Sequence, residues 1–200
     1  MPPIKHITAI AATGLLFAGC GKEEPTYYEV KEVQESPEAE TMEATHSHAE
    51  APPAKESSMG LAYSLPEGWS ETAPGRMVMT AFQAGTPPEA VADVAISAFP
   101  GDVGGQLANV NRWRRQVGLG PVAEEALQGF ITNLQVGGLD AWQVDLTGPE
   151  GQGPDGTTAR VVVTAVAHGG QTWFVKMTGT DGAVEAQLPR YQAFVQSLHF

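Results

Sequence analysis

The chain begins with a short apolar run. Residues 7–17 are almost entirely apolar, Lys5 stands before them, and the small residues Ala18 and Gly19 follow. A helix needs roughly 20 apolar residues to cross a bilayer, so this run is too short for a transmembrane helix. A positive start, a short apolar stretch and small residues at its end are the three parts of a secretory signal peptide. We therefore predict a signal peptide over residues 1–19.

From residue 59 onward, apolar and polar positions alternate, which is typical of strands with one buried face. Strands are predicted over residues 61–65, 77–83, 91–99, 130–136, 139–146, 160–167 and 172–178. Gly137-Gly138 and His168-Gly169-Gly170 each separate two neighbouring strands by a short turn, which predicts two hairpins. The second hairpin has the most regular strands, rich in Val and aromatic residues, so we expect it at the centre of the sheet.

Apolar positions recur at helical spacing in two segments of the same region, residues 106–117 and residues 181–197. The first stripe consists of Leu107, Val110, Trp113, Arg114 and Val117, with Asn109, Arg112 and Arg115 expected to face water. The second stripe consists of Val184, Leu188, Tyr191, Val195 and Leu198. Pro189 lies inside the second segment and predicts either a kink or a helix that begins at the proline.

This order of elements predicts an α+β domain over residues 59–200, with a mainly antiparallel sheet of about six or seven strands flanked by helices. The layout resembles the PsbP-like α/β/α sandwich, through residues 63–69 (YSLPEGW) and the closing residues 191–200. Residues 109–119 (NVNRWRRQVGL) also resemble a segment of bacterial lipoproteins. The resemblance implies a scaffold or accessory role, and it supplies no catalytic residue.

The segment between the apolar run and the domain has a different composition. Residues 21–58 contain ten Glu against three Lys and few large apolar residues, which predicts a disordered acidic linker. As a flexible coil, this linker would span about 35 Å. His46 and His48 lie within it near acidic side chains, but closing a disordered segment around a metal costs chain entropy. We therefore predict no metal site.

Cys20 is the one cysteine of the chain and directly follows the predicted signal peptide. Residues 15–20, LLFAGC, resemble the lipobox of bacterial lipoproteins, although Phe17 stands where Leu is usual. The resemblance implies that Cys20 carries a diacylglyceryl anchor, whose two acyl chains suffice for stable attachment to a membrane. The anchor would lie in the cell membrane or the outer membrane. Gly21 follows the cysteine in place of the Asp that resembles an inner-membrane retention signal of enteric bacteria, so the outer membrane is favoured if the host has one. The alternative is an ordinary signal peptide cut near Ala18, with a cysteine that has no role.

The net charge of the chain bears on which classes of partner it could bind. The chain holds 23 Asp and Glu against 11 Lys and Arg, a net charge of −12, so nucleic acid is a poor partner. Three of the arginines, Arg112, Arg114 and Arg115, surround Trp113 in the first predicted helix. They are candidate contacts for an acidic protein partner or an anionic headgroup surface. Alternatively, the arginines are a solvated helix face and Trp113 belongs to the core.

Catalytic and cofactor motifs are weak throughout. The glycine-rich residues 100–105 lack the Lys and hydroxyl of a P-loop, and Asp102 would repel a phosphate. No Gly-x-Ser-x-Gly motif is present. His168 and His199 fall on a predicted turn and at the chain end, and Asp140 and Asp145 would point to opposite faces of one strand. We therefore predict no catalytic residue, no cofactor and no enzymatic activity.

Three hypotheses for function follow from these features. The first is a lipid-anchored, non-enzymatic module of the cell envelope that binds a protein partner. The second is a domain that binds a small molecule or lipid between sheet and helix. The third is a hydrolase of unknown type. A deep apolar pocket with converging polar groups would favour the second hypothesis, and a flat patch around residues 112–115 would favour the first.

Overall fold

The computed structural model describes residues 55–56, 60–88 and 90–200. The predicted signal peptide, Cys20 and almost all of the predicted linker, including His46 and His48, lie outside the described residues. Within the described part of the chain, no helix has both the length and the apolar character that a membrane crossing requires.

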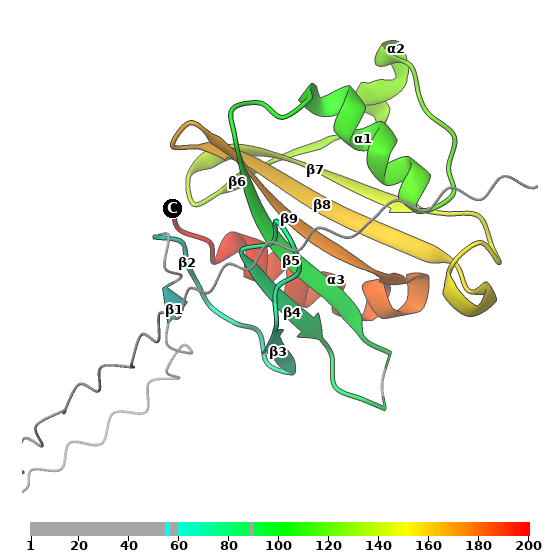
Figure 1. Cartoon of the computed structure of the whole chain (residues 1–200), viewed down its shortest axis with the longest axis horizontal. Coiled ribbons are helices and arrows are strands. Elements are labelled where there is room, and N and C mark those ends of the chain that lie inside the picture. Colours follow the sequence, from blue (N-terminus) through cyan, green and yellow to red (C-terminus); the bar gives the residue numbers. More distant parts are fainter. Residues whose placement is uncertain (1–54, 57–59, 89) are drawn as a thin grey trace, which may run out of the picture. The chain divides into compact units, whose positions relative to one another are not determined.

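A seven-stranded antiparallel sheet in the order β3-β4-β5-β9-β8-β7-β6 organises the fold (Figure 1). Its strands are β3 (Trp69–Thr72), β4 (Thr80–Ala84), β5 (Ala92–Pro100), β6 (Thr132–Val136), β7 (Leu139–Thr147), β8 (Ala159–His168) and β9 (Gln171–Thr180). Strand β9 is central and lies between β5 and β8, which confirms the predicted position of the second hairpin. Both predicted hairpins form, with Gly137, Gly138, Gly169 and Gly170 all at positive φ in their turns.

The first predicted strand does not join this sheet. Residues 62–63 form β2 (Ala62–Tyr63), which pairs with β1 (Lys55–Glu56) in a separate two-stranded sheet. Ala62 also exchanges two backbone hydrogen bonds of 2.9 Å with His199 near the C-terminus. The seventh strand of the large sheet is instead β3, which the hydrophobic pattern missed because Trp69 is its one buried residue.

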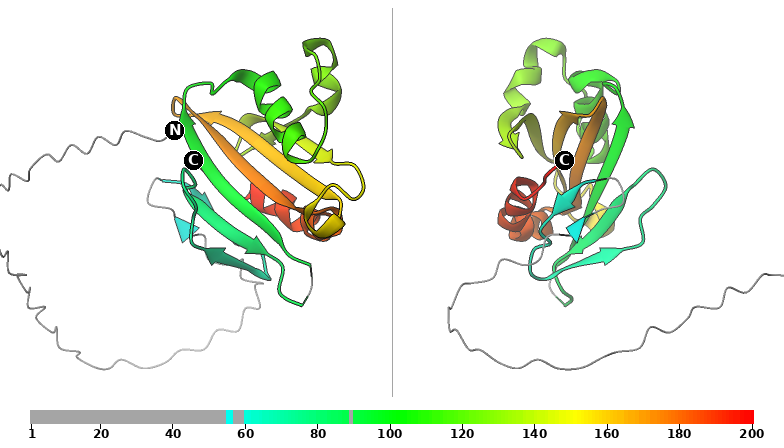
Figure 2. Two further views of the ribbon diagram at one scale, coloured as in Figure 1. Left: turned by 45° about the vertical axis from the view of Figure 1, so that its right-hand side comes forward. Right: turned by 90° about the vertical axis from the view of Figure 1, so that its left-hand side faces the viewer.

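Helices cover both faces of the sheet, as the two apolar stripes predicted (Figures 1 and 2). Helix α1 (Gly105–Gln116) packs on one face, where Val110 and Trp113 meet Val161 and Val163 of β8. Helix α3 (Asp181–Gln196) packs on the other, where Phe194 joins a separate core cluster. Successive β8 residues point to opposite faces and serve the two clusters in turn. A short helix α2 (Glu124–Leu127) and two 3-10 turns, η1 (Gln128–Phe130) and η2 (Pro154–Gly156), complete the fold.

Helix α3 begins at Asp181 and continues through Pro189, so the alternative of a helix beginning at the proline is wrong. Thr180 caps its N-terminus, because the Thr180 hydroxyl accepts a hydrogen bond from the Ala183 backbone N–H. The proline removes one hydrogen bond of the helix. Tyr191 of α3 is fully buried and donates its hydroxyl proton to the carbonyl of Val175 in the central strand β9, so the helix is also held to the sheet by this bond.

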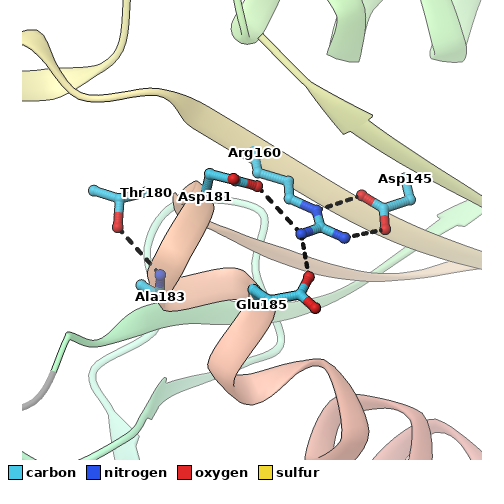
Figure 3. A network of polar contacts seen from close by, with 6 residues as sticks. All are labelled: Asp145, Arg160, Thr180, Asp181, Ala183 and Glu185. Atoms are coloured by element: carbon cyan, nitrogen blue, oxygen red, sulfur yellow. Dashed lines mark hydrogen bonds and ion pairs between the residues drawn. The ribbon is translucent and has the colours of Figure 1, made fainter. Parts of the chain in front are cut away.

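A cluster of charged residues joins α3 to β7 and β8 (Figure 3). The guanidinium of Arg160 binds both carboxylate oxygens of Asp145 at 2.7 Å, and it also contacts Asp181 at 3.2 Å and Glu185 at 2.6 Å. Asp145 above all, and Glu185 after it, raise the pKa of Arg160 further above its usual range. Asp145, one of the carboxylates considered in the sequence analysis, is therefore bound to Arg160 in an ion pair that joins β7 to β8.

Asn109 corrects one prediction for α1. It was expected to face water, but only 2% of its surface is exposed. Its amide nitrogen donates to the carbonyls of Val103 and Gly105, both at 2.8 Å, and its amide oxygen accepts from Arg112 at 2.6 Å. The buried amide is therefore hydrogen-bonded on both atoms, as burial of a polar group requires.

A candidate ligand cavity between helix α1 and the sheet

A cavity of about 390 Å³ lies between α1, the adjoining sheet face and the loop that joins β3 to β4. It is lined by Met77, Val78, Ala95, Ser97, Phe99, Val103, Arg112, Trp113, Gln116, Val163, Phe174 and Lys176. Its volume falls within the roughly 300–1,000 Å³ of typical small-molecule sites. Most of the lining is apolar, and two of its side chains are cations.

Lys176 lies in the central strand β9, directly between Ala95 of β5 and Val163 of β8. Its neighbours along the strand, Val175 and Met177, belong to the core beneath α3, so alternation turns Lys176 toward the α1 face. The side chain is half-buried there. Burial lowers the pKa of Lys176 below its usual range, and the positive charge of Arg112 lowers it further. An ammonium group is therefore held where its charge is unfavourable.

Arg112 reaches the same cavity from α1 but keeps an exposed side chain. One of its N–H groups donates to Asn109, and its guanidinium lies 5.9 Å from the centre of the Trp113 ring. A guanidinium has five N–H donors, so the bond to Asn109 leaves most of them available for other acceptors. The buried amide of Asn109 thus positions Arg112 at the rim of the cavity.

Aromatic rings form the apolar wall. Phe174 lies edge-on to Trp113, with ring centres 5.7 Å apart, and its ring centre is 6.2 Å from that of Phe99. Edge-on and tilted ring pairs are favourable contacts. These contacts therefore stabilise the apolar wall of the cavity.

Met77 is the most exposed large apolar residue in the described chain that also lines the cavity, with 68% of its surface exposed. It lies in a turn closed by a hydrogen bond from the Val78 N–H to the Gly75 carbonyl, and its φ is 64°. Positive φ is uncommon for a residue with a side chain. The turn therefore holds an apolar side chain at the cavity in an unfavourable backbone conformation.

The four residues singled out in the sequence as a possible partner-binding cluster differ in exposure and in the groups they contact. Trp113 is 3% exposed and belongs to the core. Arg114 donates to the Gly120 carbonyl at 2.7 Å and lies 4.7 Å from the Phe130 ring centre, so it stabilises the loop after the helix. Arg112 lines the cavity, and Arg115 is exposed. Partner binding through these residues stays a prediction.

Other sequence candidates lie apart from the cavity. His168 stacks near Phe200, with ring centres 5.5 Å apart, and His199 pairs through its backbone with Ala62. The glycine-rich start of α1 borders a second hollow whose lining includes the acidic residues Asp102, Glu124 and Asp140. Among the described residues, no group of three or more His, Cys, Asp or Glu could hold a metal ion.

Lys176 is the functional candidate that sequence reasoning missed. It appeared as one polar position of an alternating strand, where a lysine usually faces water. One feature of the sequence could have identified Lys176, namely its place in a strand predicted to be central. Helices cover both faces of such a strand, so a lysine there does not simply face water. The sequence did single out Arg112, but as a surface residue.

The chain was compared with protein-family models, curated proteins and solved structures, and the matches bear on its fold alone. No protein-family model matches the chain, and no curated protein matches it. Similar solved structures include one from Bacteroides thetaiotaomicron (15% identity, TM-score 0.43), covering 70% of this chain and 44% of that one. Another is LpqN, involved in cell envelope biogenesis of Mycobacterium tuberculosis (12%, TM-score 0.46), covering 76% and 86%. A third is the cyanobacterial PsbP of Synechocystis sp. PCC 6803 (14%, TM-score 0.46), covering 78% and 96%. The seven-stranded antiparallel sheet with helices on both faces confirms the predicted α+β class.

Proposed function

We propose that the protein is a non-enzymatic binding module of the cell envelope, anchored through lipid on Cys20, whose domain holds a small molecule in the cavity beneath α1. One observation carries the binding role. A mostly apolar cavity with an aromatic wall is lined by two cations, Arg112 and Lys176, and by no acidic residue among the described residues. A few polar groups in a mostly apolar hollow are the usual composition of a ligand site.

A binding role fits the cavity better than a catalytic one. Its described lining contains no His, Cys, Asp or Glu, which leaves Ser97 and Lys176 as the groups that could act as nucleophile or base. Ser97 pairs across the strands with Phe174, whereas Lys176 pairs with Ala95, so the hydroxyl and the amine are offset along the sheet. The hydrolase hypothesis required an acid or a serine beside a histidine, and that combination is missing from this lining.

The substitution Ala95→Phe tests the proposed site. Ala95 lines the cavity on β5, so a phenyl ring there would fill the space that a ligand needs. We expect the full chain purified from a bacterial envelope to carry a small molecule detectable by mass spectrometry of its organic extract, and the Ala95→Phe chain to carry none. Because overpacking can destabilise a protein, circular dichroism and Tm check that the Ala95→Phe chain is folded.

The control is Ala98→Ser, a smaller change on the opposite face of the same strand. Ala98 packs against the α3-side core and does not line the cavity, so the extract should be unchanged. Equal ligand content in the Ala95→Phe chain and the native chain would contradict the proposed function.

A further inference from the structure

We propose that the ligand of this cavity is a small amphiphile with one anionic group, a carboxylate or a phosphate monoester, bound by Arg112 and Lys176, with its apolar part against Phe99, Trp113 and Phe174. The inference rests on the proposed function, because it takes the cavity to be a binding site. It adds the chemical class of the ligand.

The distribution of charge supports an anionic group. Residues 59–200 contain thirteen acidic residues and seven basic ones, so carboxylates outnumber cations in the domain. Arg160 contacts three carboxylates at once. Arg112 and Lys176, in contrast, have no carboxylate among their hydrogen bonds and ion pairs with the described residues. The positive charges of the two side chains repel each other, which lowers the pKa of Lys176.

Two like charges at one apolar cavity are unfavourable until a counter-charge arrives. Burial makes the ammonium of Lys176 costly, and the guanidinium of Arg112 adds to that cost. A single anion placed between them would interact favourably with both cations and reduce their repulsion. Arg112 offers a planar pair of N–H donors that suits carboxylate and phosphate oxygens, and Lys176 offers a compact charge.

The side chains around the two cations favour a ligand that also has an apolar part. The lining contributes about twice as many apolar as polar side chains, including the edge-on ring pair of Trp113 and Phe174. Met77 extends this surface at the exposed side of the cavity. An inorganic anion alone would leave these apolar groups in contact with water, whereas a chain or ring attached to the anion would cover them.

The test is isothermal titration calorimetry of the purified full chain with probes of one chain length. The probes are octanoate, octyl phosphate, octanol and octylammonium, each below its micellar concentration, with acetate as the headgroup alone. We expect the two anionic probes to bind about tenfold or more tightly than octanol. Octylammonium and acetate should not bind measurably, since the first is repelled and the second lacks the apolar part.

Variants then assign the selectivity to residues. Lys176→Met and Arg112→Gln should each weaken octanoate binding about tenfold while octanol binding is retained. The control Arg190→Gln removes the same charge from an exposed position on α3, at the opposite face, and should change affinity less than about twofold. Circular dichroism checks that each variant is folded.

A second readout separates direct contact from a general effect of charge. In an NMR titration of the lysine side chains, octanoate should raise the pKa of Lys176, and octanol should leave it low. Equal affinities for octanoate and octanol would overturn the anionic assignment while leaving the cavity as a binding site. An equal loss in Arg190→Gln and Arg112→Gln would also overturn it. Failure of every probe to bind would contradict the proposed function itself.

Discussion

Lys176 occupies a position that an apolar residue of similar length would fill without electrostatic cost. The neighbouring Ala95 and Val163 on either side carry no group that can pair with an ammonium. Proteins retain such unfavourable residues mainly where function needs them. Met77, with its positive φ at the same cavity, is a second unfavourable feature in the same place. Both features point to the cavity as a site maintained for binding.

Replacing Lys176 by Met should therefore stabilise the domain at neutral pH. The folded-state pKa of Lys176 is lowered, so the unfolded chain binds the proton more readily and native stability rises as the pH climbs from the folded toward the unfolded pKa. The gain from Lys176→Met is about 1 kcal/mol or less, because the side chain retains contact with water that screens its charge. This corresponds to at most about 2–4 °C in Tm.

Thermal unfolding at several pH values checks this prediction. The difference in Tm between Lys176→Met and the native chain should be largest near pH 7 and should shrink near pH 10.5, where the native amine is largely neutral. A variant less stable than the native chain at pH 7 would mean that the ammonium has a stabilising partner.

At the scale of elements, the sequence predicted most of what depends on local pattern. Gly137-Gly138 marked its hairpin because both turn residues need positive φ, and the α3 stripe identified the buried face of that helix. The environment of residues that contact distant segments was harder to predict from the sequence. Asn109 is buried because the chain at Val103 folds back over it, and Lys176 faces a cavity because α1 covers its strand.

The junction of α3 with β7 and β8 is held by Arg160, and its removal should weaken that junction. Arg160→Met would leave Asp145, Asp181 and Glu185 without the cation that they share (Figure 3). Because the carboxylates are largely exposed and partly screened, we expect a loss of about 1–2 kcal/mol rather than the larger cost of a fully buried pair.

Urea unfolding at low and high salt measures this loss. The difference between Arg160→Met and the native chain should decrease as salt screens the remaining contacts and the repulsion among the acids. Arg190→Met, on the exposed side of the same helix, should change stability by less than about 0.5 kcal/mol. Similar effects of the two substitutions would show that the Arg160 cluster has no special role.

At the scale of the whole molecule, the proposed anchor and the binding domain are separable parts. The sequence places Cys20 and the acidic segment that follows it before a domain with its own two-sided core. Binding in the cavity should therefore not depend on the lipid, while attachment to the membrane should depend on it entirely.

Cys20→Ser tests this division. Without the thiol no diacylglyceryl group can be attached, so the chain should move from the membrane fraction to the soluble fraction of the cell envelope. Ser47→Ala, a change in the predicted linker, should leave the protein with the membranes. Cys20→Ser protein that stays in the membrane fraction would contradict the anchor, and altered octanoate affinity would contradict the independence of the domain.

The pairing of Ala62 with His199 has a mechanical consequence for a tethered protein. A pull transmitted through the tether would first reach β1, which pairs with β2. It would next reach Ala62, whose two hydrogen bonds with His199 lead to the last residues of the chain. Figure 1 places the C-terminus beside β2, so this load would act on β1, β2 and the C-terminal residues together. Tension should therefore separate these short pairings before it loads the large sheet that carries the ligand cavity.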